Sequence, residues 1–131
     1  TRPALVLLVE DDPQVRALAR DILLHANYGV LDAENGERAV QLAAEHAGQV
    51  DLLLTDVIMP QTSGPTLAGR LLALHPRLKV IYMSGYTDGA IGKHGVLDPD
   101  VAFLSKPFTP RSLTKKVEEV LGPRPAAAAQ G

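Results

Sequence analysis

The sequence predicts a doubly wound α/β domain with a five-stranded parallel sheet. Five apolar runs are each too short to form a helix and are bounded by polar or turn residues, which is typical of strands buried on both faces. Most segments between these runs carry apolar residues at helical spacing. A helix between consecutive strands makes them parallel, because each right-handed crossover places its helix over one face of the sheet.

The first strand is expected at Ala4–Val9, an uninterrupted apolar run that ends abruptly in acidic residues. Asp12 followed by Pro13 is a typical pair of N-cap and first helical residue, so the first helix follows this strand directly. The apolar face of this helix consists of Val15, Leu18, Ala19, Ile22 and Leu23.

The second strand is expected at Tyr28–Ala33 and the third at Asp51–Thr55. Asn35 and Gly36 form a turn that leads into a second helix with a weaker apolar stripe. A third helix follows the third strand and ends before Pro76, since the residue preceding a proline disfavours helical dihedrals. Its apolar residues are Leu67, Leu71 and Leu74.

The fourth strand is expected at Lys79–Ser84 and the fifth at Val101–Ser105. Four glycines and a proline interrupt Gly85–Pro99, so we expect an irregular fourth helix there. Thr109 and Pro110 repeat the signal of N-cap and first helical residue, which predicts a last helix after the fifth strand.

The composition fits one compact domain. The chain has 131 residues, 46% of them hydrophobic, which is enough to bury a core without disulfides. We expect the domain to span residues 1–122 and the alanine-rich residues 123–131 to form a flexible tail or linker. The absence of cysteine excludes thiolate nucleophiles, so any metal would be bound by oxygen or imidazole.

Charge and hydropathy exclude two classes of partner. A net charge of -2 gives no basic surface for direct binding to nucleic acid. The apolar runs are far shorter than the ~20 residues of a membrane span, so no membrane insertion is expected. We therefore expect a cytoplasmic domain.

Several residues suited to phosphoryl chemistry end or follow the predicted strands. Ligands of an open parallel sheet bind at the carboxyl ends of its strands, so side chains at those ends are expected to lie together. Converging carboxylates repel one another unless a cation neutralises them, and their hard oxygens favour Mg²⁺. A carboxylate nucleophile, a metal ion, a lysine and a hydroxyl would suffice for phosphoryl transfer. The residues in question are Glu10, Asp11, Asp56, Ser84 and Lys106.

Five short motifs occur in the order and near the spacings of one known family. They are LLVEDDP at Leu7–Pro13, LLLTDVIMP at Leu52–Pro60, Gly64, MSGYTD at Met83–Asp88 and FLSKPF at Phe103–Phe108. Over about residues 4–121 the sequence resembles the receiver domains of two-component response regulators, the CheY-like group. The resemblance implies a flavodoxin-like strand order, 2-1-3-4-5, and a role in phosphorelay signalling.

The resemblance implies that Asp56 accepts a phosphoryl group from a phosphohistidine on a histidine kinase or histidine phosphotransfer domain. Glu10 and Asp11 match the acidic pair that holds Mg²⁺ with Asp56, and the backbone carbonyl of Ile58 would be a further ligand. Asp12 lies one position beyond this pair and is assigned to helix capping. Such a domain is not a conventional enzyme, although it promotes its own phosphorylation and a slow autodephosphorylation.

The resemblance also assigns the remaining site residues. Ser84 matches the hydroxyl residue that hydrogen-bonds the phosphoryl group, and Lys106 matches the lysine that forms an ion pair with it. The Lys106–Pro107 peptide bond is expected to be cis. Phe103 occupies the aromatic switch position, so Ser84 and Phe103 are expected to convert phosphorylation into a conformational change.

Two positions bear on the lifetime of the phosphorylated state. Ile58 and Tyr86 lie two residues after the phosphoacceptor and the hydroxyl residue, where polar side chains of related receivers orient the attacking water. Ile58 offers no hydrogen bond and Tyr86 is bulky, so slow hydrolysis is expected. The MSGYTD and HGVLDP stretches are most similar to receivers attached to hybrid histidine kinases.

Two other functions compete with the phosphorelay interpretation. A Mg²⁺-dependent phosphatase with an aspartate nucleophile would need a second aspartate two residues later, where Ile58 stands. A pseudo-receiver that only binds partners is not favoured, because every expected site residue is present.

The four histidines do not contribute to the predicted site. His25, His46, His75 and His94 lack metal-ligand spacing and are interpreted as surface residues. Met59 and Tyr82 are interpreted as core residues.

Overall fold

The computed structural model describes residues 4–46, 48–59, 62–84 and 101–122. The segment of the expected fourth helix and the expected tail lie outside the described residues. The elements in chain order are β1 (Leu5–Val9), α1 (Pro13–His25), β2 (Gly29–Ala33), α2 (Gly36–Glu45), β3 (Leu52–Asp56), α3 (Gly64–Leu74), β4 (Lys79–Ser84), β5 (Val101–Ser105) and α5 (Pro110–Leu121).

The strands form one parallel sheet in the order β2-β1-β3-β4-β5, which confirms the expected topology. The predicted strand bounds differ from the observed ones by at most one residue. The difference matters at β3, where Asp56 belongs to the strand because it pairs in register with Met83 of β4. The main chain of Asp56 is therefore held by the sheet rather than by a loop.

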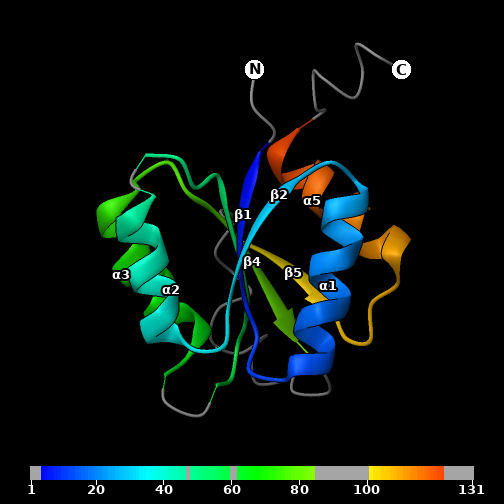
Figure 1. The fold of residues 1–131 in the computed structure, drawn as a ribbon, viewed down its shortest axis with the longest axis horizontal. Coiled ribbons are helices and arrows are strands. Elements are labelled where there is room, and N and C mark those ends of the chain that lie inside the picture. Colours follow the sequence, from blue (N-terminus) through cyan, green and yellow to red (C-terminus); the bar gives the residue numbers. More distant parts are fainter. Residues whose placement is uncertain (1–3, 47, 60–61, 85–100, 123–131) are drawn as a thin grey trace.

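Helices cover both faces of the sheet. Figure 1 shows α2 and α3 on one side and α1 and α5 on the other. Alternate residues of β1 serve the two layers, since Leu7 packs with α2 and α3 whereas Leu8 packs with α1 and α5. Both leucines are fully buried. This explains why the first strand reads as a continuous apolar run.

Side chains before each described helix cap its N-terminus. Asp12 accepts hydrogen bonds from the backbone of Gln14 and Val15, which confirms its assignment to capping. Thr109 caps α5 and forms a reciprocal capping box with Ser112. These caps fix where each helix begins relative to the strand before it.

One interpretation of the histidines was wrong, because His75 is buried. It ends α3, and its Nε2 donates a hydrogen bond of 3.2 Å to the backbone carbonyl of Ala43 in α2. The ring is therefore a link between two helices. His25 is exposed, as expected, and His94 lies outside the described residues.

The expectations about two core residues are borne out. Met59 and Tyr82 lie in the core, as predicted. In the part of the chain that the structure describes, each helix falls short of the length and apolar character needed to cross a bilayer.

Candidate functional site

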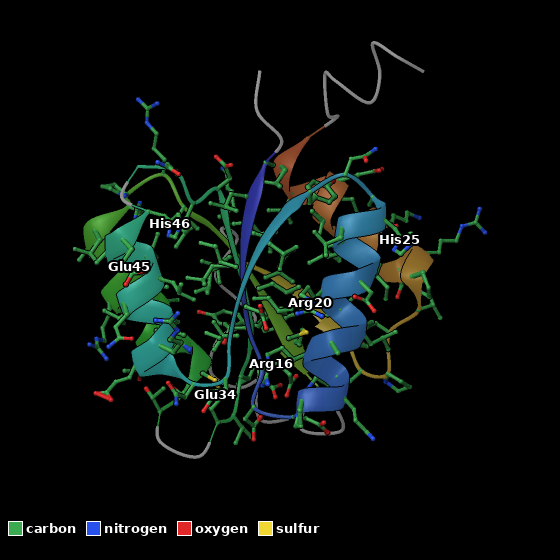
Figure 2. All side chains as sticks on the ribbon, in the orientation of Figure 1. Arg16, Arg20, His25, Glu34, Glu45 and His46 are labelled. Carbon is green, nitrogen blue, oxygen red and sulfur yellow. The ribbon has the colours of Figure 1, made fainter. Side chains whose placement is uncertain are left out.

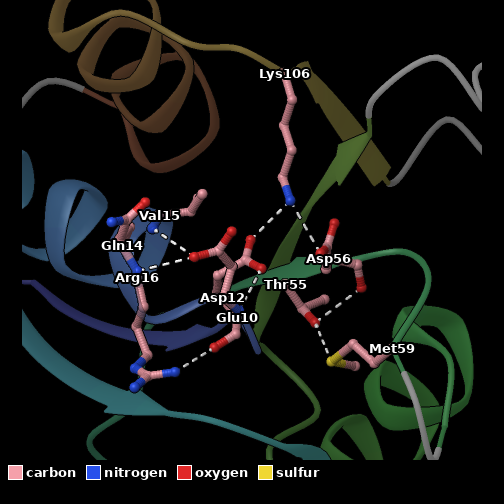
Figure 3. A network of polar contacts seen from close by, with 9 residues as sticks. All are labelled: Glu10, Asp12, Gln14, Val15, Arg16, Thr55, Asp56, Met59 and Lys106. Atoms are coloured by element: carbon pink, nitrogen blue, oxygen red, sulfur yellow. Dashed lines mark hydrogen bonds and ion pairs between the residues drawn. The ribbon is translucent and has the colours of Figure 1, made fainter.

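The candidate site lies at the carboxyl edge of the sheet, where the sequence predicted it. Val9 of β1 is in register with Thr55 of β3, so the next residues, Glu10 and Asp56, emerge side by side. Lys106 follows β5 and extends toward both of them (Figure 3). Three strand ends thus contribute charged side chains to one place.

Three carboxylates gather at this edge. One oxygen each from Glu10, Asp11 and Asp56 can be chosen so that all lie within 4.8 Å of one another. Their exposure differs, since the side chain of Glu10 is 1% exposed and that of Asp56 is 15% exposed, whereas Asp11 is open to solvent. Oxygen donors of this kind and number suit a hard divalent cation.

The ammonium of Lys106 bridges two of these carboxylates. Its Nζ donates at 2.8 Å to Oε1 of Glu10 and at 3.0 Å to Oδ2 of Asp56. The Lys106–Pro107 peptide bond is cis, as the resemblance implied. One positive charge therefore opposes three negative ones within the cluster.

The surroundings shift the pKa values of two of these groups. Burial raises the pKa of Glu10 above its ordinary value, and the hydrogen bonds from Lys106 and from the backbone of Asp12 only partly oppose this. Burial alone would lower the pKa of Lys106, but its hydrogen bonds with Glu10 and Asp56 outweigh this and raise it. Lys106 therefore stays charged at neutral pH and acts as a fixed counter-ion.

The loop between β1 and α1 is held by side chains as well as by the sheet. Oε2 of Glu10 accepts a hydrogen bond of 3.1 Å from the backbone of Asp12. Nη1 of Arg16 donates at 2.7 Å to the backbone carbonyl of Glu10, and its Nε lies 3.5 Å from Oδ2 of Asp32. Sequence reasoning missed Arg16, because an arginine on an amphipathic helix usually faces solvent.

The loop after β3 packs closely against the main chain of Asp56. The backbone N–H of Gly64 donates at 2.7 Å to the carbonyl of Val57. A Cβ atom at Gly64 would lie 2.4 Å from the carbonyl oxygen of Asp56 and 3.1 Å from the ring of Tyr82. Only glycine allows this approach, so α3 begins directly against the strand that carries Asp56.

The structure describes the remaining predicted site residues only in part. Ser84 ends β4, which pairs with β3, the strand of Asp56. Phe103 on β5 is half-buried and its ring centroid lies 5.6 Å from that of Tyr82. Ile58, two residues after Asp56, is 62% exposed, and Tyr86 lies outside the described residues.

Comparison with known proteins identifies the family. The model of the response regulator receiver domain matches residues 6–118. The chain belongs to this receiver domain family. The receiver domain accordingly carries its acidic cluster and its bridging lysine at the edge of a fold that serves two-component signalling.

Individual relatives agree with this assignment. The receiver domain is 39% identical over 118 residues to the sensor kinase CckA of Brucella abortus, a match that covers 90% of this chain and 12% of that kinase. It is 34% identical over 116 residues to the response regulator receiver protein CpdR of the same organism, with 88% of this chain and 95% of CpdR covered. The same sequence unit thus occurs as a small part of a kinase and as nearly a whole protein.

Solved structures give the same picture. The receiver domain of the hybrid histidine kinase CckA superposes with a TM-score of 0.78 at 36% identity, over 90% of this chain and 99% of that one. The chemotaxis protein CheY4 of Vibrio cholerae superposes with a TM-score of 0.81 at 26% identity, over 91% of this chain and 99% of that one. The receiver fold is therefore shared over about nine tenths of this chain.

Proposed function

We propose that Asp56 accepts a phosphoryl group from a phosphohistidine of a histidine kinase or histidine phosphotransfer domain. The observation that carries this proposal is the ion pair of 3.0 Å between Asp56 and Lys106 beside two further carboxylates. The Asp56 carboxylate is 15% exposed, so a donor can reach it from the edge of the sheet. Because Asp56 is the last residue of β3, a donor would approach it from the carboxyl edge of the sheet.

The transfer breaks one bond and forms one bond. A carboxylate oxygen of Asp56 attacks phosphorus, and the P–N bond to the donor imidazole breaks as the acyl phosphate forms. The electron pair of that bond stays on the imidazole nitrogen, which then takes a proton. Lys106 would pair with the phosphoryl oxygens, and we assign the hydroxyl of Ser84 to hydrogen-bond them.

The residues at this edge also fit a Mg²⁺ ion. Glu10, Asp11 and Asp56 supply hard oxygen ligands, and the backbone carbonyl of Ile58 is proposed as a fourth. The ammonium of Lys106 already bridges two of these carboxylates, and this contact supports the proposal that the cluster attracts positive charge. A bound Mg²⁺ would offset the negative charge that the incoming phosphoryl group brings to the carboxylates.

We infer that Ser84 and Phe103 report phosphorylation to the rest of the domain. Phosphorylation would draw the Ser84 hydroxyl toward the phosphoryl oxygens, and the half-buried ring of Phe103 would shift in response. Phe103 already contacts Tyr82, so its movement would alter the packing between β4 and β5.

We also propose an organisation for the chain. Residues 1–122 would act as the receiver unit, with residues 123–131 as a tail or linker, and the unit would work in the cytoplasm. The identity to part of the sensor kinase CckA supports a role beside a hybrid histidine kinase, where the donor histidine is supplied at high effective concentration.

Removal of the metal provides the direct test of this function. Incubation with acetyl phosphate and Mg²⁺ is expected to add one phosphoryl group, seen by intact mass, and EDTA is expected to abolish the addition. Borohydride reduction followed by peptide mapping should locate the acyl phosphate at Asp56. Uptake that persists in EDTA, or a modified residue other than Asp56, would contradict the proposal.

We propose that Ile58 helps to set the lifetime of the phosphorylated state. Its apolar side chain lies exposed two residues after Asp56 and cannot orient water, so Ile58→Asn is expected to speed dephosphorylation roughly tenfold. This is less than the ~100-fold of general acid–base catalysis, because an amide positions water without taking its proton.

The measurement is the decay of the phosphorylated mass after removal of the donor. Ile58→Leu is the matched control and should decay like wild type. The double variant Ile58→Asn with Tyr86→Glu should decay fastest. Equal decay of all four proteins would show that these side chains do not control access of water.

A further inference from the structure

Arg16 links the loop after β1, next to the acidic cluster, to strand β2. It stands on α1, where its side chain is 19% exposed, and it contacts the carbonyl of Glu10 (Figure 3). Its other contact is with the carboxylate of Asp32. Arg20, one turn later on the same helix, offers a contrast, since its side chain is 45% exposed and lies 3.9 Å from Asp21 (Figure 2). Of the two arginines, Arg16 thus has the more buried side chain and the shorter contacts.

The contact with Arg16 completes the anchoring of Glu10. The backbone N–H of Glu10 donates at 3.1 Å to the carbonyl of Ala33, and its carbonyl accepts the hydrogen bond from Arg16. The two carboxylate oxygens bind Lys106 and the backbone of Asp12. Each hydrogen-bonding group of Glu10 therefore has a defined partner.

The carbonyl that Arg16 holds belongs to the peptide bond between Glu10 and Asp11. A peptide unit is planar, so holding its orientation restricts ψ of Glu10 and φ of Asp11, two of the torsions that aim the flanking side chains. These are the two residues that the proposed cation site takes from the loop after β1. One guanidinium group can therefore fix the aim of two carboxylates at once.

We propose that Arg16 is a positioning residue for the cation site, anchored by Asp32 and acting through the Glu10–Asp11 peptide. This inference rests on the proposed function, because it assumes that the cluster binds Mg²⁺. Arg16 contacts the backbone carbonyl of Glu10 and not the carboxylate oxygens of the proposed cation site. Its planar, forked guanidinium suits this role, since Nη1 donates to the carbonyl of Glu10 while Nε faces Asp32.

Charge and geometry predict opposite results when Arg16 is removed. Loss of a positive charge near a cation site should strengthen Mg²⁺ binding, because one repulsion disappears. Loss of a group that orients the ligands should weaken it, typically by 10-fold or more. We expect the geometric effect to win, with about 10-fold weaker binding in Arg16→Met.

The experiment compares the affinity for Mg²⁺ with stability. The Mg²⁺ dissociation constants of wild type, Arg16→Met, Arg16→Lys, Asp32→Asn and Arg20→Met are measured by following backbone amide NMR signals during titration, without any phosphodonor. Urea unfolding of the metal-free proteins is measured in parallel. Arg20→Met removes the same charge from the same helix and is the matched control.

We expect Arg16→Met to bind Mg²⁺ about 10-fold more weakly, Arg16→Lys and Asp32→Asn to lie between it and wild type, and Arg20→Met to match wild type. The amide signals of Asp11 and Asp12 should also shift in metal-free Arg16→Met. If that variant does not fold, Arg16→Lys still tests the positioning role, because it keeps the charge and loses only the forked geometry.

Two outcomes would overturn the inference, and they are distinguishable. Reduced urea stability with unchanged Mg²⁺ affinity in both Arg16→Met and Asp32→Asn would make Arg16 merely structural. A wild-type protein that binds no Mg²⁺ would instead overturn the proposed function together with this inference.

Discussion

Asp56→Asn is expected to abolish phosphoryl uptake while leaving the metal-free domain at least as stable as wild type. The amide has no nucleophilic carboxylate oxygen, so the acyl phosphate cannot form. The variant also removes one of three negative charges that face a single ammonium group. Relief of like-charge repulsion at a partly exposed site is worth on the order of 1 kcal/mol, so the melting temperature should not fall.

Asp12→Asn is the matched control for this experiment. It removes one charge next to the cluster and keeps the side-chain oxygen that caps α1, so it should be phosphorylated normally. Intact mass after incubation with acetyl phosphate and Mg²⁺ measures uptake, and thermal unfolding measures stability. Undiminished uptake in Asp56→Asn would refute the assignment, and a clearly lower melting temperature would make Asp56 a structural hydrogen-bonding group.

Gly64→Ala is expected to lower the free energy of unfolding by about 3 kcal/mol. The added Cβ would lie 2.4 Å from the carbonyl oxygen of Asp56, which belongs to a paired strand and cannot move without breaking the ladder. Forced overpacking of this kind costs up to about 3 kcal/mol. For a domain of this size the melting temperature should drop by roughly 10 °C.

The same helix supplies an opposite control. Gly69 also lies in α3, but a Cβ atom there meets nothing within 4 Å, so Gly69→Ala should be stabilising by up to about 1 kcal/mol through helix propensity. Urea unfolding of the two variants should therefore give changes of opposite sign. Equal stability of Gly64→Ala and wild type would mean that the start of α3 can shift away from β3 at little cost.

The sequence predicts best the buried strands and the side chains at their carboxyl ends. Continuous apolar runs marked the buried strands, and parallel strands bring their carboxyl ends to one edge. That rule alone placed Glu10, Asp56 and Lys106 together, and the structure bears this out through two ion pairs. Asp12 was separated from the acidic pair by its proline neighbour, which marks a helix start, and its capping bonds confirm that choice.

The features that sequence reasoning missed depend on partners without a sequence signature. Arg16 and His75 both bind backbone carbonyls, and any residue can supply such a carbonyl. The pairing of Lys106 with Asp56 depends on side-chain reach across β4, and its pairing with Glu10 on reach across β4 and β3. The capping box of α5 uses Ser112 where glutamate or glutamine is usual, so its pattern was not recognised.

The bridge made by Lys106 has a consequence for protein turnover. It joins residues 96 and 50 positions apart in the chain, so the site exists only when the first, third and fifth strands are all assembled. A ligand bound there therefore stabilises the whole domain, by about 2.7 kcal/mol at a free concentration 100 times its dissociation constant. Occupied molecules open less often and are degraded more slowly. Occupancy of this site and resistance to degradation are therefore expected to rise together.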